Sequence, residues 1–214
     1  MPLALFDLDD TLVGRSSAVG TCASEFCTAA GYGPEIKAWV VTELADRAGP
    51  EDFARLRRTF GLVEPVAQLW QGYVNAMAAA VSCRPEALGA LAMLRDSGWK
   101  IGVVTNGPSD IQRAKLRATG IADLVDGIAV SGDIGVRKPD RLLFETAAKR
   151  CGAELGDDTW TVGDSPVADI GGAQQAGLRS IWIRGRSWPS GLADPDHTVG
   201  DVLEAIDILL KHGS

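Results

Sequence analysis

The sequence has few histidines and cysteines, and it has no long hydrophobic segment. Its two histidines, and four cysteines without any Cys-x-x-Cys spacing, give no sign of a zinc site. No apolar run approaches the roughly 20 residues of a membrane-spanning helix. The first apolar residues lead into Asp7 with no basic segment before them, which does not match a signal peptide. We therefore expect a cytoplasmic protein with reduced thiols and no membrane association.

Basic residues are outnumbered by acidic ones. The 21 Lys and Arg against 28 Asp and Glu give a formal net charge of −7 and a pI near 4.9. A net acidic chain is not typical of proteins that bind nucleic acid or anionic lipid, so we expect neither partner. A small phosphorylated metabolite needs only a local positive site. The 214 residues suffice for one domain with a small inserted subdomain, and we expect a monomer or a weak homodimer.

Short apolar segments recur along the chain and end at Asp, Thr-Asn or Gly. They are residues 3–6, 101–104, 128–130, 160–162 and 180–183. Helical patterns follow in residues 85–96, 110–119, 140–151, 169–176 and 201–211. Continuous apolar strands that alternate with helices are typical of a parallel sheet covered on both faces. The sequence therefore predicts an α/β fold with a doubly wound parallel sheet.

Residues 15–84 interrupt this alternation. They are rich in Ala, Glu and Arg, lack convincing β-branched strands, and are divided by Gly and Pro into about four helices. Because the insertion follows the first strand directly, it would lie over the crevice where open α/β sheets bind ligands. We predict an α/β core of residues 1–14 and 85–214 with an inserted all-α cap of residues 15–84.

Two acidic groups follow apolar strands. Asp7 and Asp9 are two residues apart, so an extended chain places them on one face, where their charges repel unless a cation or a proton lies between them. Asp164 and Asp169 follow the strand at 160–162. Each group alone is explained equally well as a polar turn, with Asp169 as a helix cap. Together, neighbouring strand ends would bring Asp7, Asp9 and Asp164 around one point, and hard oxygen ligands there suit Mg²⁺.

Two further segments supply positive or hydrogen-bonding groups. Thr105 and Asn106 end the strand at 101–104 and offer a hydroxyl and backbone N–H groups to an anion. Lys138 precedes Pro139, which favours an extended conformation from which the ammonium reaches back to the strand edge. Taken alone, Thr105-Asn106 would be interpreted as an ordinary turn, and Lys138 as an ordinary surface lysine.

The order and spacing of these segments resemble the haloacid dehalogenase-like (HAD) hydrolase superfamily. The family pattern is an Asp-x-Asp-x-Thr strand end, a Thr or Ser strand end, a Lys that often precedes Pro, and a Gly-Asp turn with a later Asp. The sequence contains all of them in this order: Asp7-Leu8-Asp9-Asp10-Thr11, Thr105, Lys138-Pro139 and Gly163-Asp164 through Asp169. The resemblance covers residues 1–14 and 85–214, and the insertion is similar to the family's cap. Ala168 departs from the pattern, because many relatives have Asn there.

The resemblance implies a Mg²⁺-dependent phosphatase that hydrolyses a small phosphomonoester through an aspartyl-phosphate. Asp7 would be the nucleophile, and Asp9 would protonate the leaving alkoxide and then deprotonate the attacking water. The metal would be held by the Asp7 carboxylate, the Asp9 backbone carbonyl and Asp164.

The remaining motif residues would bind and stabilise the phosphoryl group. The resemblance assigns its oxygens to the Thr105 hydroxyl and the Asn106 N–H. Lys138 would stabilise the charge on Asp7 and on the phosphoryl group. Asp169 would orient Lys138 or a metal-bound water.

Asp9 separates this interpretation from others in the family. Haloacid dehalogenases lack the second aspartate, because a halide leaving group needs no proton, and phosphonate-cleaving relatives use a cap lysine, for which residues 15–84 offer Lys37 alone. A sugar-phosphate mutase keeps both aspartates and stays open. So does a catalytically silent phosphometabolite-binding protein, although every catalytic position is filled.

The cap residues do not identify a substrate. Four arginines offer contacts to a second anionic group, and three aromatic residues offer an apolar wall: Arg15, Arg55, Arg57 and Arg58, and Trp39, Trp70 and Tyr73. Each is explained as well by a solvated or a core position.

Overall fold

The computed structural model describes residues 1–213 and contains one parallel sheet. Its strands are β1 (Leu3–Phe6), β2 (Lys100–Thr105), β3 (Gly127–Val130), β4 (Thr159–Gly163), β5 (Arg179–Ile183) and β6 (His197–Val199). The strand order is β3-β2-β1-β4-β5-β6. This order confirms the predicted doubly wound sheet, and it places the carboxyl end of β1 at the point where the winding reverses.

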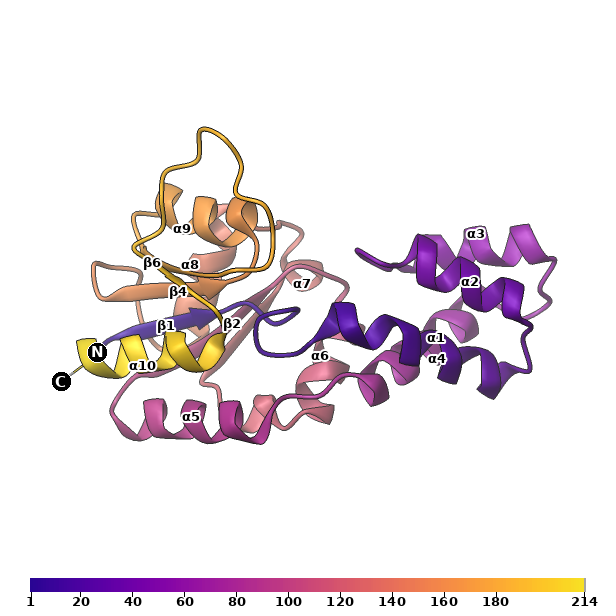
Figure 1. Cartoon of the computed structure of the whole chain (residues 1–214), viewed down its shortest axis with the longest axis horizontal. Coiled ribbons are helices and arrows are strands. Elements are labelled where there is room, and N and C mark those ends of the chain that lie inside the picture. The colour runs from indigo at the N-terminus through magenta and orange to yellow at the C-terminus, as the bar shows by residue number, and fades with distance from the viewer. Residues whose placement is uncertain (214) are drawn as a thin grey trace.

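Helices cover both faces of the sheet. Figure 1 shows α5 (Pro85–Asp96) and α10 (Val202–His212) below it, and α8 (Arg141–Arg150) and α9 (Gly172–Gln175) above it. Along β1, Leu3 and Leu5 join the buried cluster on the α8 side, whereas Ala4 and Phe6 join the larger cluster on the α5 side. Because both faces are buried, the strand is apolar at every position.

Several predicted helices match the structure, and two of them begin at an aspartate that caps the helix. Helix α5 spans the predicted residues 85–96. Asp140 accepts a hydrogen bond from Leu142 N–H at the start of α8, and Asp201 accepts one from Leu203 N–H at the start of α10, each at 2.9 Å. Helix α6 (Ser109–Ala118) begins one residue before its predicted start. Two short segments were not predicted, η1 (Ile121–Asp123) and α7 (Ser131–Ile134).

The helix expected at residues 169–176 starts earlier and is irregular. A π-helical segment, η2 (Pro166–Gly171), precedes α9. The Ser165 hydroxyl accepts a hydrogen bond from Ala168 N–H at 3.2 Å and caps this segment. Asp169 therefore lies inside the helical segment and is not its cap, which leaves its carboxylate free to face the sheet.

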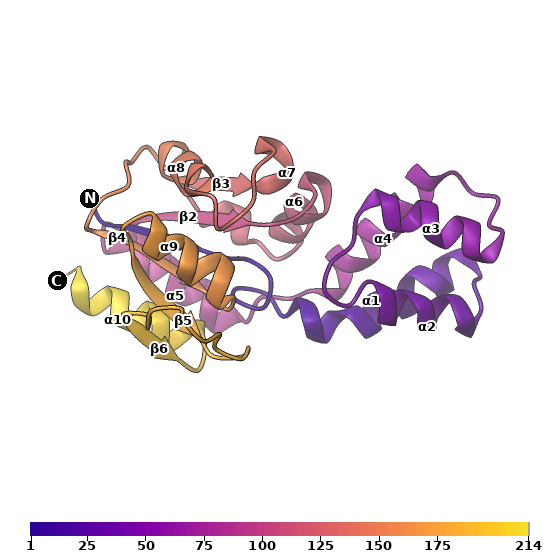
Figure 2. The same cartoon turned by 90° about the horizontal axis from the view of Figure 1, so that it is seen from above.

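Four helices lie between β1 and α5. They are α1 (Arg15–Ala30), α2 (Pro34–Glu43), α3 (Pro50–Phe60) and α4 (Val66–Ala80). Figures 1 and 2 both show them standing apart from the sheet, on the side toward which β1 runs. Their interior is aromatic, with the rings of Phe53 and Tyr73 5.1 Å apart and Trp70 stacked on Tyr73 at 6.0 Å. Trp70 and Tyr73 are thus core residues.

Within residues 1–213, no single helix is long and apolar enough to cross a membrane. Helices α4 and α5 pass that test of length and composition only as a pair, and they are bent by 84° relative to each other.

Candidate active site

The carboxyl ends of three adjacent strands bring the predicted residues together. Strand β1 pairs with β2 through Phe6 and Val103, and with β4 through Phe6 and Val162. The Asp7 N–H donates to the Val162 carbonyl at 2.9 Å, so Asp7 continues the β1 line at the sheet edge. Residues that follow β2 and β4 reach the same edge from either side, as expected for parallel neighbours.

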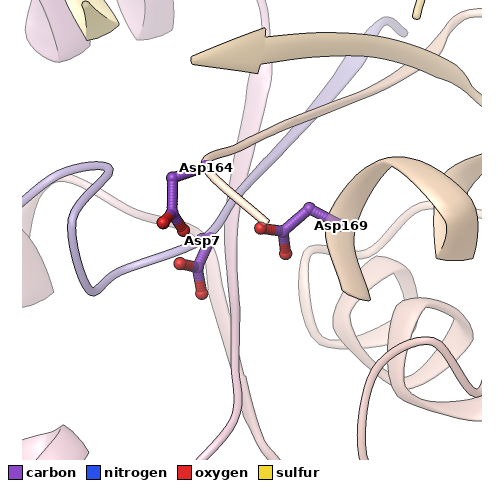
Figure 3. A group of neighbouring side chains, drawn as sticks. All are labelled: Asp7, Asp164 and Asp169. Atoms are coloured by element: carbon purple, nitrogen blue, oxygen red, sulfur yellow. The ribbon is translucent and has the colours of Figure 1, made fainter. Parts of the chain in front are cut away.

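Three carboxylates converge at this edge. Oxygens of Asp7, Asp164 and Asp169 lie within 4.8 Å of one another, and all three side chains are buried. Figure 3 shows them arriving from β1, from the turn after β4 and from η2. A Cβ on Gly163 would lie 2.3 Å from the Asp169 carboxyl carbon, so a glycine there lets Asp169 approach. The sequence predicted Asp7, Asp9 and Asp164 around one point. The structure instead brings Asp7 and Asp164 together with Asp169, and the Asp9 carboxylate lies apart from them.

Lys138 supplies the cation of this cluster. Its Nζ donates to Asp7 Oδ1 and to the Val104 carbonyl, each at 2.6 Å, and forms an ion pair with Asp169 Oδ1 at 2.6 Å. Burial alone would lower the pKa of Lys138, but the Asp169 and Asp7 carboxylates together raise it above its ordinary value. The ammonium is therefore charged. Asn106 holds the backbone of Lys138 in place, because its Oδ1 accepts from the Lys138 N–H at 2.9 Å.

The cluster holds three carboxyl groups against two cations, Lys138 and Arg186. Burial raises the pKa of Asp7 to about 8, with Asp169 adding to the shift and Lys138 opposing it. Burial also raises the pKa of Asp164, although Arg186 Nε donates to its Oδ2 at 2.6 Å. Crowded carboxylates with raised pKa values indicate room for a further cation. The all-oxygen donor set of Asp7 and Asp164, with Asp169 beside them, fits Mg²⁺ in preference to a softer metal.

Asp9 lies outside the carboxylate cluster. Both of its carboxylate oxygens accept from the Lys115 Nζ at 2.8 Å, and Oδ2 also accepts from Gln112 Nε2 at 3.2 Å. Gln112 Nε2 in turn donates to the Thr105 hydroxyl. The Asp9 side chain is therefore directed toward α6, and only its backbone carbonyl is left as a candidate metal ligand.

Sequence reasoning missed three of these partners. Gln112 and Lys115 are nearly fully buried and lie on the same side of α6 as Ile111 and Leu116. Two polar residues within a buried helical face are a usable signal, because such residues need partners in the interior. Arg186 belongs to the irregular segment after β5, where the sequence carries no comparable pattern.

Two adjoining cavities open at the site. One of about 220 Å³ is lined by the carboxylate cluster, Lys138 and Thr105. The other, of about 370 Å³, lies between residues 46–49 and the start of α6. Asp9 and Asn106 line both. The first is lined by charged and hydrogen-bonding groups, and the second provides additional space beside it.

Arg15, the first residue of α1, lines both cavities. Its side chain is buried and donates to the Leu44 carbonyl at 2.8 Å and to the Ala45 carbonyl. Arg55 instead pairs with Glu43 at 3.1 Å and lies over the Trp39 ring, outside both cavities. Of the arginines considered from the sequence, Arg15 is the one that reaches the site.

The fold and the cluster of strand-end aspartates with a buried lysine define a hydrolase class. Residues 1–177 match the model of the haloacid dehalogenase-like hydrolase family. The chain belongs to this family, as its motifs indicated.

Individual relatives agree with the family. The pyrimidine 5′-nucleotidase YjjG of Escherichia coli is 36% identical over 152 residues, 70% of this chain and 66% of that protein. The phosphoserine phosphatase of Thermus thermophilus is 39% identical over 121 residues, 56% of this chain and 48% of that protein. The chain thus spans between about half and two thirds of these two relatives.

A solved structure matches along nearly the whole chain. The putative HAD-hydrolase YfnB of Bacillus subtilis, solved bound to magnesium, superposes with a TM-score of 0.71 at 25% identity. The match covers 97% of this chain and 98% of that one.

Proposed function

We propose that this chain is a Mg²⁺-dependent phosphatase that hydrolyses a small phosphomonoester through an aspartyl-phosphate. The observation that carries the proposal is the placement of Asp7, whose buried carboxylate lies 2.6 Å from the Lys138 ammonium and faces the 220 Å³ cavity. A carboxylate nucleophile needs such a cation, because it must approach a phosphoryl group of like charge. The relatives named as a nucleotidase and a phosphatase support the same reaction.

Asp7 is the proposed nucleophile. Its attack on phosphorus forms the aspartyl-phosphate and releases the alcohol, and water then hydrolyses the intermediate. Mg²⁺, held by Asp7, the Asp9 carbonyl and Asp164, would supply positive charge against the phosphoryl oxygens. Lys138 contributes the protein's own charge there, and Asp169 fixes Lys138 by the ion pair at 2.6 Å.

Asp9 is the proposed acid and base. It protonates the leaving oxygen in the first half of the reaction and accepts a proton from water in the second. Its place at the boundary of the two cavities supports this role, because the bond that breaks lies between phosphorus and the leaving group. The Thr105 hydroxyl and the Asn106 N–H are the proposed donors to the phosphoryl oxygens.

The leaving group is proposed to occupy the 370 Å³ cavity. Residues 46–49 form one wall of this cavity, so residues 15–84 would act as a cap on a core of residues 1–14 and 85–214. A cavity of this size holds a small metabolite and not a polymer. Arg47 and Arg137 line it together with Asp46 and Glu51, so the proposed leaving group is polar.

The test is hydrolysis of p-nitrophenyl phosphate with Mg²⁺ and with EDTA, with the Asp7→Asn protein as the control. Release of p-nitrophenol that requires Mg²⁺ and is lost in the variant is the expected result. Release that persists in Asp7→Asn would contradict the nucleophile, and rescue by Zn²⁺ alone would contradict the metal. If the wild type is inactive on this ester and on a panel of phosphometabolites, trapping of a phosphoenzyme separates a mutase from a silent binding protein.

A further inference from the structure

Lys115 is a buried lysine with a defined partner. Only 1% of the residue is exposed, although it lies on a helix near the molecular surface. A buried ammonium requires compensating charge and hydrogen bonds. Asp9 provides the charge, because both of its carboxylate oxygens lie 2.8 Å from Lys115 Nζ. Contact with two oxygens fixes the orientation of the carboxylate more tightly than contact with one.

Gln112 completes the arrangement one turn earlier on α6. Its Oε1 accepts from Lys115 Nζ at 2.7 Å, and its Nε2 donates to Asp9 Oδ2 at 3.2 Å and to the Thr105 hydroxyl. It is also 1% exposed. A Cβ on Gly107 would lie 3.1 Å from Gln112 Cγ, so the turn after β2 leaves space for this side chain. Gln112 thus connects Asp9, in the turn after β1, with Thr105, the last residue of β2.

The network lies where the two cavities meet. Asp9, Gln112 and Lys115 all line the 370 Å³ cavity, and Asp9 and Thr105 line the 220 Å³ cavity. The carboxyl group of Asp9 is therefore held between the space for the phosphoryl group and the space for the leaving group. Without Lys115, that side chain has no other cation within hydrogen-bond distance in the described residues and keeps only the 3.2 Å hydrogen bond from Gln112 Nε2.

We propose that Lys115, oriented by Gln112, is a positioning residue that holds the Asp9 carboxyl at this boundary for proton transfer to the leaving oxygen. The inference rests on the proposed phosphatase function and adds two residues of α6 to it. Lys115 does not touch the reacting atoms in this account, and its effect on the reaction passes through Asp9.

The test compares two esters of similar size, phenyl phosphate and p-nitrophenyl phosphate. Phenolate needs protonation to leave far more than p-nitrophenolate does, and kcat/KM reports on steps up to release of the leaving group. For Lys115→Met, we expect kcat/KM to fall by about tenfold to a hundredfold on phenyl phosphate. This is at most the lower end of the roughly hundredfold to ten-thousandfold that general acid catalysis contributes, because Asp9 itself is still present. We expect a several-fold smaller fall on p-nitrophenyl phosphate, because only the proton transfer is impaired.

A double-mutant cycle with Asp9→Asn identifies the route of the effect. If Lys115 acts through Asp9, Lys115→Met adds no further selective loss on phenyl phosphate once Asp9 is replaced. Equal losses on both esters, or a selective loss that persists in the Asp9→Asn background, would show a general structural role and overturn the inference. Arg113→Met is the matched control, because it removes a cation of the same helix that pairs with Asp133 and not with Asp9.

Two further results distinguish a failure of the role proposed for Lys115 from a failure of the proposed phosphatase function. If Lys115→Met does not fold, Gln112→Met leaves the Lys115–Asp9 pair in place and should give a weaker form of the same selective loss; its absence would overturn the inference. If Asp9→Asn itself shows no greater loss on phenyl phosphate, the acid role fails and the inference fails with it. A selective loss in Asp9→Asn alone would leave the function standing and reject only the role of Lys115.

Discussion

Gly163 and Asp169 lie so close together that a side chain at position 163 would collide with the Asp169 carboxylate. A Cβ at Gly163 would lie 2.3 Å from both Cγ and Oδ2 of Asp169, well inside contact distance. Asp169 is also held by the Ser165 N–H, which donates to Oδ2 at 2.9 Å, and by the ion pair with Lys138. The last residue of β4 therefore determines how close the Asp169 carboxylate comes to the rest of the cluster.

Gly163→Ala should consequently lower both stability and activity. The added methyl group must displace Asp169, which loosens its contacts with Ser165 and Lys138. We expect the free energy of unfolding to fall by about 1–3 kcal/mol, as for overpacking of a close-packed site. Gly156→Ala is the control, since nothing lies within 4 Å of a Cβ there. Chemical denaturation measures both variants, and equal stability of the two would contradict this account.

Asp7→Asn should abolish turnover and preserve the fold. The change is nearly isosteric, but an amide does not attack phosphorus, so we expect kcat to fall by about a thousandfold or more. The amide side chain of the variant retains an oxygen that can accept from Lys138. Steady-state kinetics and circular dichroism on the same preparation make the measurement. An unfolded variant would be uninformative about chemistry, and Asp7→Glu, which keeps the charge but moves it, then provides the comparison.

Most of the fold was predictable because strands β1 to β5 are buried on both faces over nearly their whole length. Segments such as residues 101–104 are apolar throughout and end at polar turns, so the sequence marks them directly. Strand β6 was missed because it is three residues long, lies at the edge of the sheet and includes a half-buried His197 and an exposed Thr198. An edge strand of that kind has no apolar pattern to detect.

The aspartates of the site were predictable for the same reason, since they follow strands whose ends meet. The direction of the Asp9 side chain could not be predicted from the sequence. It depends on Lys115, which lies more than a hundred residues away in the sequence and reaches Asp9 only because α6 packs beside the end of β1. Arg186 was missed because it comes from an irregular segment after β5. Contacts of this kind are set by tertiary packing and leave little trace in local pattern.

Asp126 should make stability depend on acid pH. Partial burial would raise its pKa, but hydrogen bonds from Lys100 Nζ at 2.7 Å and the Ile101 N–H at 2.9 Å outweigh this and hold the pKa below 3.8. A carboxyl whose folded pKa is depressed stabilises the fold above its unfolded pKa and loses that contribution as pH falls through the folded pKa. The stabilisation is therefore complete at neutral pH, begins to fall near the ordinary pKa of 3.8 and is lost as the pH falls further through the lower pKa of the folded state.

The comparison of wild type with Asp126→Asn tests this dependence. We expect the wild type to be more stable by about 1 kcal/mol at pH 7, and the difference to shrink as the pH falls below 3.8. Asp123→Asn is the control, because the Asp123 side chain forms no ion pair among residues 1–213. Urea denaturation between pH 3 and pH 7 provides the data. A difference that stays constant over this range would show that Asp126 does not act through its charge.

Arg186 places a positive charge next to a proposed metal ligand. Its Nε lies 2.6 Å from Asp164 Oδ2, and its side chain is 56% exposed, whereas that of Asp164 is 8% exposed. The guanidinium therefore screens a buried carboxylate from the solvent side. A divalent cation that binds Asp164 must either share this carboxylate with the arginine, which sets like charges close together, or displace the arginine, which breaks its ion pair with Asp164.

Arg186→Met should therefore tighten Mg²⁺ binding to the metal-free protein. We expect the Kd to fall by about threefold to tenfold, the change that corresponds to removal of one partly exposed charge near the ion. Isothermal titration calorimetry measures this without reference to turnover. Arg184→Met is the matched control, because Arg184 is an exposed arginine two residues earlier in the same segment and does not contact Asp164. If Arg186→Met binds Mg²⁺ more weakly than both the wild type and the control, the arginine supports the metal site by holding Asp164 in place, and competition by charge is not its main effect.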